Sequence, residues 1–124
     1  MNSSKNILII DDIEENIDIL ERQLKAEGFN VLSANEAPKG LHILKNQHID
    51  LLLLDINMPV LDGITLLGNI REDKSLEHVA IIMVTALDDV KTALDCLKKG
   101  ACGYITKPYS MSQINQQIEH CFKR

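Results

Sequence analysis

Polar residues follow four of the five short apolar runs in this sequence, and their types suit one chemistry. They are Asp11 and Asp12 after the first run, Asp55 at the end of the third, Thr85 after the fourth and Lys107 after the fifth. Carboxylates without His or Cys supply the oxygen ligands that Mg²⁺ prefers. A carboxylate can also attack phosphorus, while a hydroxyl and an ammonium group bind the other phosphoryl oxygens. These residue types predict a magnesium-dependent phosphoryl acceptor, with Asp55 as the acceptor.

Each of these residues also has a simpler structural interpretation. The alternatives are Asp12 as a helix cap, Asp55 in a turn with Pro59, Thr85 in a capping box with Asp88, and Lys107 as a solvated lysine. A bare carboxylate cluster would be unfavourable, since two such charges about 4 Å apart repel by about 4 kcal/mol at an effective dielectric constant of about 20. Together the five residues favour the functional interpretation, because one sheet edge would gather them and a cation would relieve the repulsion.

The elements that would position these residues alternate along the chain. Apolar runs cover residues 6–10, 30–34, 50–55, 80–84 and 102–106, and each precedes apolar residues at helical spacing, within 13–24, 37–44, 64–70, 90–97 and 111–121. Strands that are apolar throughout must be covered on both faces, which is typical of a parallel sheet between helices. We therefore predict a doubly wound α/β domain, with the third strand central and the fifth at an edge. Ligands of such sheets bind outside the carboxyl ends of the strands.

Turn and cap residues agree with these boundaries. Gly28 and Gly100 follow the first and fourth predicted helices, where glycine is favoured. Pro38 fits a first helical turn, and Ser110 with Gln113 has the spacing of a capping box.

Composition narrows the class of protein. The chain has 124 residues, 45% of them hydrophobic, which is enough for one domain with a buried core. A formal net charge of −5 and the lack of a basic run argue against nucleic-acid binding. No apolar run approaches the length of a membrane span, and residues 1–6 are not followed by the apolar stretch of a signal peptide. We expect a cytoplasmic protein.

The cysteines and aromatic residues exclude other kinds of site. Cys96, Cys102 and Cys121 are odd in number and widely spaced, unlike the paired ligands of a zinc site. We expect all three to be reduced and to serve as small core or helix residues. With four aromatic residues and no Trp, stacking platforms for bases or flavins are poorly supplied.

Four segments carry a resemblance to a known family. They read I-L-I-I-D-D at 7–12, L-L-L-L-D-I-N-M-P-V-L-D-G at 51–63, V-T-A at 84–86 and Y-I-T-K-P-Y at 104–109. In this order and spacing they resemble the receiver domains of two-component response regulators, of the chemotaxis-regulator type, over essentially the whole chain. The resemblance implies a single flavodoxin-like domain over 1–124, with five helices around a five-stranded parallel sheet in the order 2-1-3-4-5.

The resemblance also implies a role for each matching residue. Asp55 would be the phosphorylation site, and Mg²⁺ would be held by Asp12, by Asp55, by Asp11 through water, and by the backbone carbonyl of Asn57. Lys107, the Thr85 hydroxyl and the Ala86 amide would bind the phosphoryl oxygens, and the Lys107–Pro108 bond would be cis. Thr85 and Tyr104 would form a switch: Thr85 moves toward the phosphate, and the exposed Tyr104 ring fills the vacated space. The face made by the fourth helix, fifth strand and fifth helix would then select a partner.

The family implies partners of particular kinds. The phosphoryl donor would be a sensor histidine kinase or a histidine phosphotransfer protein, and the output would be a downstream protein or a further domain, with no direct role for nucleic acid or membrane. The sequence ends just after the fifth predicted helix, which is consistent with a stand-alone regulator and equally with a segment of a longer regulator or hybrid kinase. The apolar residues of the last two helices fit either a homodimer contact or the core.

Three competing functions remain to be compared. A phosphatase of the haloacid dehalogenase type needs a second acid two residues after the nucleophile, where this chain has Asn57. A flavodoxin-like carrier needs a phosphate loop after the first strand, where residues 11–15 are mostly acidic. A degenerate receiver that only binds partners usually lacks one of the five key residues, and here all are present. The resemblance implies a signalling domain, not an enzyme for a separate substrate, that catalyses its own phosphorylation and dephosphorylation.

The chain departs from the family pattern at a few positions. Ile13 stands where another acid is common, and Tyr109 where Phe is common. Leu87 and Asn57 would flank the approach of water to the phosphoryl group and are expected to influence dephosphorylation.

Overall fold

Five parallel strands form one sheet in this protein. The computed structural model describes residues 5–58 and 61–123. The strand order is β2-β1-β3-β4-β5, and the strands are β1 (Asn6–Ile10), β2 (Asn30–Ala34), β3 (Leu51–Leu54), β4 (Ala80–Thr85) and β5 (Gly103–Thr106). The predicted doubly wound sheet, its strand order and the edge position of the fifth strand are confirmed. The proposed turn at Pro59 lies outside the described residues.

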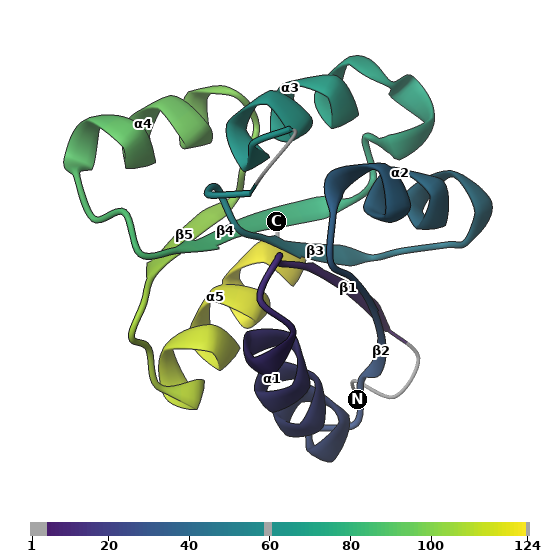
Figure 1. Ribbon diagram of the computed structural model, residues 1–124, viewed down its shortest axis with the longest axis vertical. Coiled ribbons are helices and arrows are strands. Elements are labelled where there is room, and N and C mark those ends of the chain that lie inside the picture. Colours follow the sequence, from purple (N-terminus) through teal and green to yellow (C-terminus); the bar gives the residue numbers. More distant parts are fainter. Residues whose placement is uncertain (1–4, 59–60, 124) are drawn as a thin grey trace.

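Helices cover both faces of the sheet (Figure 1). One face packs against α1 (Glu14–Ala26) and α5 (Met111–Phe122). The other packs against α2 (Ala37–Asn46), α3 (Gly63–Glu72) and α4 (Val90–Lys98), with a short 3-10 turn, η1 (Lys74–Leu76), after α3. Two apolar cores result, one on each side of the sheet, as the continuously apolar strands require.

The central strand anchors both cores. All four leucines of β3 are at most 1% exposed, and burial of each stabilises the fold by about 2 kcal/mol. Ile10 pairs with Leu54, and Leu54 pairs with Met83 on the other side. This register places the residues that follow β1, β3 and β4 at one edge of the sheet.

The helix boundaries match the expected signals in part. Ser110 and Gln113 form the predicted capping box of α5, and Gly28 and Gly100 have φ values of 97° and 111°. Two structural alternatives are wrong. The cap position of α1 is Ile13, without a side-chain cap, and α4 is capped by Asp89, not by a box of Thr85 and Asp88.

The apolar stripe of α4, which by sequence fitted either a dimer contact or the core, is largely exposed. Val90, Leu94 and Leu97 are 72%, 50% and 44% exposed, and the buried residue of this helix is Cys96. The predicted helix is confirmed, and most of its apolar stripe faces solvent. None of the helices within residues 5–58 and 61–123 combines the length and apolar character needed to cross a bilayer.

The expectation of three reduced cysteines is wrong for two of them. Cys102 and Cys121 form a disulfide with a Cα–Cα distance of 5.8 Å, and Cys96 is free and buried. Sequence spacing does not show this pairing, because the two residues meet only when α5 packs back along β5.

Candidate functional site

The predicted site residues meet at the carboxyl edge of the sheet. The backbone N–H of Asp55 donates to the carbonyl of Ile10 (3.0 Å), so the pairing of β1 and β3 continues into the acidic residues. The N–H of Lys107 likewise donates to the carbonyl of Thr85 (2.8 Å), which fixes the start of the segment after β5. Residues more than ninety positions apart in sequence therefore share one patch.

Three acidic side chains form a compact cluster. Asp11, Asp12 and Asp55 each offer a carboxylate oxygen, and these oxygens all lie within 4.8 Å of one another. Asp11 and Asp55 are buried, with 6% exposure each, whereas Asp12 is exposed. The N–H of Ile13 donates to Asp11 Oδ1 (2.9 Å) and orients that carboxylate. An all-oxygen set with one solvent-facing member is compatible with Mg²⁺, which retains water ligands.

Lys107 contacts two of the three acids. Its Nζ lies 2.9 Å from Asp11 Oδ2 and 3.6 Å from Asp55 Oδ2. The Lys107–Pro108 peptide bond is cis, as the resemblance implied. Burial lowers the pKa of Lys107, but the hydrogen bond and charge of Asp11 and the charge of Asp55 outweigh burial and raise it. The ammonium group is therefore held charged between the carboxylates.

The environment of Asp55 disfavours its negative charge. Burial raises the pKa of its carboxyl, the charge of Lys107 opposes this, and the neighbouring charge of Asp11 adds to the rise. The Thr85 hydroxyl and the N–H of Asn57, which donates to Asp55 Oδ1 at 3.4 Å, favour the ionised form. One lysine among three carboxylates leaves excess negative charge, so a divalent cation fits this donor set electrostatically.

The other predicted residues surround the acids at different depths. Thr85 is fully buried, and its Oγ1 accepts a hydrogen bond from the N–H of Leu87 at 3.4 Å. Asn57 and Ala86 are exposed at the rim. The site thus combines a buried hydroxyl with solvent-exposed residues that follow Asp55 and Thr85 in sequence.

Tyr104 is not in the exposed position that was expected. The ring is half-buried, and its hydroxyl donates to the carbonyl of Leu87 at 2.7 Å. Burial raises the pKa of this hydroxyl to about 12, so it remains a donor at neutral pH. The contact joins β5 directly to the loop after Thr85.

Two features of the site were missed by sequence analysis. One is the close ion pair of Asp11 with Lys107, which has no local signal because 96 positions separate the residues. The other is Gly63, whose N–H donates to the carbonyl of Ile56 at 2.8 Å and brings α3 against the backbone of Asp55. The Asp62–Gly63 pair signalled a turn, but not this approach.

Replacing Gly63 with alanine is expected to destabilise the protein by about 2 kcal/mol or more. A Cβ at this position would collide with the backbone carbonyl of Asp55, which cannot move without disturbing the site. Urea unfolding of Gly63→Ala measures the loss. Gly68→Ala is the matched control, because a Cβ there meets open space, and this change is expected to stabilise α3 by about 0.5–1 kcal/mol. An unchanged midpoint for Gly63→Ala would contradict the close packing.

Comparison with known sequences agrees with the geometry. Residues 7–119 match the family model described as response regulator receiver domain. Chemotaxis protein CheY-3 of Vibrio cholerae is 33% identical over 125 residues, which cover all of this chain and 96% of that protein. Response regulator PleD of Caulobacter vibrioides is 36% identical over 105 residues, covering 85% of this chain and 23% of that protein. The chain thus spans nearly all of one relative and less than a quarter of the other.

Solved structures show the same architecture. The CheX–CheY–BeF3–Mg²⁺ complex from Borrelia burgdorferi contains a chain that is 36% identical, with a TM-score of 0.89 over 95% of this chain and 89% of that one. A CheY-like receiver domain protein from Methanospirillum hungatei is 30% identical, with a TM-score of 0.83 over 96% of this chain and 97% of that one. The flavodoxin-like fold is confirmed by both.

Proposed function

This chain belongs to the family of response regulator receiver domains of two-component systems, and we propose that it accepts a phosphoryl group on Asp55. The donor is a phosphohistidine on a sensor histidine kinase or a histidine phosphotransfer protein. One observation carries this proposal: a buried carboxylate directly after the central strand lies beside two further acids and a lysine. The family match, which covers every one of these residues, supports it.

The proposed reaction is an in-line phosphoryl transfer. An Asp55 carboxylate oxygen attacks phosphorus, the N–P bond of the phosphohistidine breaks, and the imidazole leaves with a proton. Lys107, the Thr85 hydroxyl and the Ala86 amide bind the phosphoryl oxygens and stabilise the transferred charge. In the return reaction water attacks phosphorus, which restores the carboxylate and releases inorganic phosphate. The domain thus acts on its own aspartate and is a signalling module, not an enzyme for a separate substrate.

The cofactor proposed for this site is Mg²⁺. Asp12 and Asp55 would bind it directly, Asp11 through water, and the Asn57 carbonyl would supply a further oxygen. When bound, the ion contributes positive charge that offsets both the carboxylate cluster and the phosphoryl oxygens. Asp11 is already paired with Lys107 at 2.9 Å, which agrees with an indirect role for Asp11.

Incubation with Mg²⁺ and acetyl phosphate tests the function. We expect a single phosphoryl adduct by intact-mass spectrometry, formed only when Mg²⁺ is present. A haloacid dehalogenase-type phosphatase would instead turn over the donor without accumulating an adduct, and a pure binding module would do neither. Either of these outcomes would overturn the proposal.

Leu87 is expected to lengthen the life of the phosphorylated state. Its half-buried apolar side chain follows Thr85 on the loop beside the proposed water path. In Leu87→Glu the backbone contacts remain, and a carboxylate can orient water, so the aspartyl phosphate lifetime should fall by about tenfold. Decay of the adduct after donor removal gives the lifetime. Leu94→Glu on exposed α4 is the control, and an unchanged lifetime in Leu87→Glu would exclude this role.

The output surface in this proposal is the face formed by α4, β5 and α5. Exposed Val90, Leu94 and Leu97 supply an apolar stripe that a downstream protein, an attached output domain or a second copy of the chain would cover. Phosphorylation would draw Thr85 toward the phosphate and change the contact of Tyr104 with Leu87, altering this face as a population shift. The supporting observation is the Tyr104–Leu87 hydrogen bond, which links β5 to the site loop.

Cytoplasmic location is part of the same proposal. Phosphohistidine donors are made from ATP, which supports a site of action inside the cell. The negative net charge and the absence of a basic run support protein partners over nucleic acid.

A further inference from the structure

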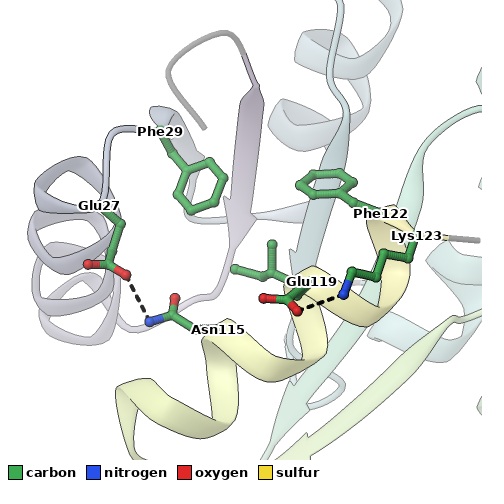
Figure 2. A pocket seen from close by; sticks show the side chains of 7 residues that line it. Glu27, Phe29, Asn115, Glu119, Phe122 and Lys123 are labelled. Carbon is green, nitrogen blue, oxygen red and sulfur yellow. Dashed lines mark hydrogen bonds and ion pairs between the residues drawn. The ribbon is translucent and has the colours of Figure 1, made fainter. Parts of the chain in front are cut away.

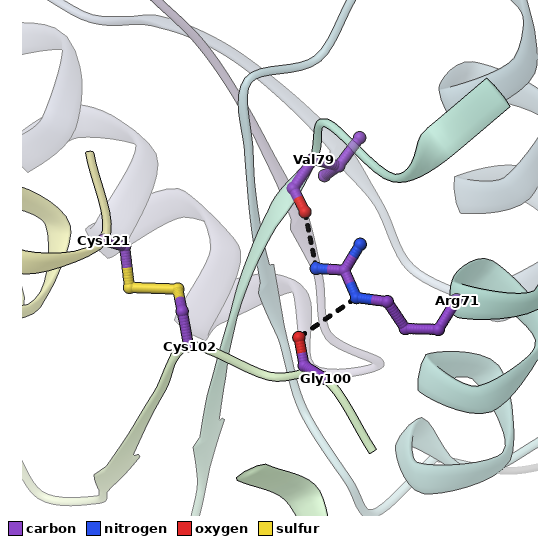
Figure 3. Close-up of a disulfide and its surroundings, with 5 residues drawn as sticks. All are labelled: Arg71, Val79, Gly100, Cys102 and Cys121. Atoms are coloured by element: carbon purple, nitrogen blue, oxygen red, sulfur yellow. Dashed lines mark hydrogen bonds between the residues drawn. A yellow bond between two sulfur atoms is a disulfide. The ribbon is translucent and has the colours of Figure 1, made fainter. Parts of the chain in front are cut away.

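The Cys102–Cys121 disulfide joins two elements of the proposed output face. Cys102 directly precedes β5, Cys121 lies in the last turn of α5, and 19 positions separate them (Figure 3). The closed loop contains all of β5, Lys107 and most of α5. Its closure point is at the end of β5 opposite Lys107, so the bond restrains α5 without touching the acidic cluster.

Within the part of the chain that the structure describes, apolar packing and a few exposed contacts also hold the end of α5. Ile118 is buried against the sheet, and an exposed hydrogen bond from Asn115 Nδ2 to Glu27 Oε1 (2.9 Å) joins α5 to the end of α1 (Figure 2). Beyond these, Phe122 is half-buried, with Lys5 Nζ 5.1 Å from its ring centre. Exposed hydrogen bonds and cation–π contacts stabilise a fold only weakly. The disulfide adds a covalent restraint on the last turns to the apolar packing of Ile118 and Phe122.

The two cysteines of the bond differ in exposure, and small reagents would reach the bond through Cys102. Cys121 lines a hollow of about 460 Å³ together with Arg71, His78 and Gly100. Cys102 is half-buried, whereas Cys121 is only 6% exposed. The Arg71 guanidinium donates to the carbonyls of Gly100 and Val79, and Glu77 lines the same hollow, which therefore carries charges of both signs. Cys96 is 0% exposed and has no such access.

We propose that Cys102 and Cys121 form a reversible dithiol–disulfide switch that holds the end of α5 against β5 and exchanges with small thiols of the glutathione class. Disulfides in cytoplasmic proteins of most organisms are transient and often redox-sensing, so this regulatory role rests on the location proposed above. The chemistry balances with two small thiols. The thiolate of the first attacks one sulfur, the protein S–S bond breaks, and a mixed disulfide forms as the other cysteine leaves and takes a proton. The second small thiol attacks this mixed disulfide, which releases the oxidised small disulfide and the remaining cysteine as a free thiol.

Oxidation would change the freedom of α5, not the chemistry at Asp55. In the oxidised form, conformations with the end of α5 away from β5 are removed by the closed loop. In the reduced form the last turns are held by the apolar packing of Ile118, Cys121 and Phe122 and by the weak polar contacts. Gln117, whose side chain covers Gly103, lies on these turns, so opening would expose the start of β5 within the output face.

The test uses the unphosphorylated full chain in buffers of reduced and oxidised glutathione. Thiol alkylation with mass spectrometry should count one free thiol in oxidising buffer and three in reducing buffer, with intermediate ratios between. Hydrogen exchange at residues 115–122 should be at least about tenfold faster in the reduced form, and the melting temperature lower by about 10 °C. Exchange in β1 and β3 should change least.

Two variants make the result specific. Cys96→Ser should retain the full redox response, since this thiol takes no part. Cys121→Ala should show the fast exchange of α5 in both buffers, and if it folds poorly, the wild-type comparison still decides. The proposed switch would be contradicted if the disulfide never forms or is never reduced by glutathione. Equal rates of hydrogen exchange in α5 in both buffers would also contradict it. None of these readouts involves phosphorylation, so failure here is distinct from failure of the Asp55 proposal.

Discussion

Asp55→Asn should abolish the phosphoryl adduct completely. The amide keeps the size of the carboxylate but is a far weaker nucleophile toward phosphorus, and it cannot form the acyl phosphate. The substitution also removes one charge from a cluster whose acids repel, so the variant should fold at least as stably as the wild type. Intact-mass spectrometry after incubation with acetyl phosphate and Mg²⁺ gives the adduct level.

Asp18→Asn provides the matched control for that experiment. Asp18 is an exposed acid on α1, outside the acidic cluster, and its loss makes the same change in net charge. The control should form the adduct at the wild-type level. Adduct formation that survives in Asp55→Asn would place the acceptor on another acid.

Magnesium should stabilise the folded domain strongly, and Asp12→Ala should abolish this effect. An ion that binds the folded state alone, at about one hundred times its dissociation constant, adds about 2.7 kcal/mol. For a domain of this size the melting temperature should rise by about 10 °C. Asp12 is the exposed member of the acidic cluster, so its removal takes away a ligand without opening a cavity in the core.

Thermal unfolding with and without Mg²⁺ measures this shift. Asp18→Ala should retain it, because that side chain is exposed on α1 and remote from the cluster oxygens. In the absence of metal, Asp12→Ala should melt no lower than the wild type, since one repulsive charge is gone. A full magnesium shift in Asp12→Ala would place the ion elsewhere.

The sheet could be predicted because its strands carry an unusually plain signal. Leu51–Leu54 is apolar on both faces, which only a covered parallel strand tolerates, and the polar residues begin where each strand ends. Parallel pairing then brings those ends together without further information. The burial of α4 could not be predicted in the same way. An apolar stripe such as Val90, Leu94 and Leu97 has the same spacing whether it packs in the core or faces solvent.

Within the site, the residues that come together could be predicted from the sequence, but their contacts with one another could not. The three acids and Lys107 were expected at one edge and are found there. Lys107 contacts Asp11 most closely, and 96 positions separate the two residues in sequence. This contact depends on side-chain geometry, which sequence spacing does not indicate. The Cys102–Cys121 bond has the same origin, since the packing of α5 on β5 decides it. Such long-range contacts follow from the fold as a whole.

Chemical mapping of the phosphoryl group tests the central claim most directly. Borohydride reduces an acyl phosphate to an alcohol, so an aspartyl phosphate becomes homoserine in the chain. After treatment with acetyl phosphate and Mg²⁺, peptide mass spectrometry should find homoserine at position 55 and nowhere else. Homoserine at position 11 or 12, or none at any position despite an intact folded domain, would contradict the assignment of Asp55 as the phosphoryl acceptor.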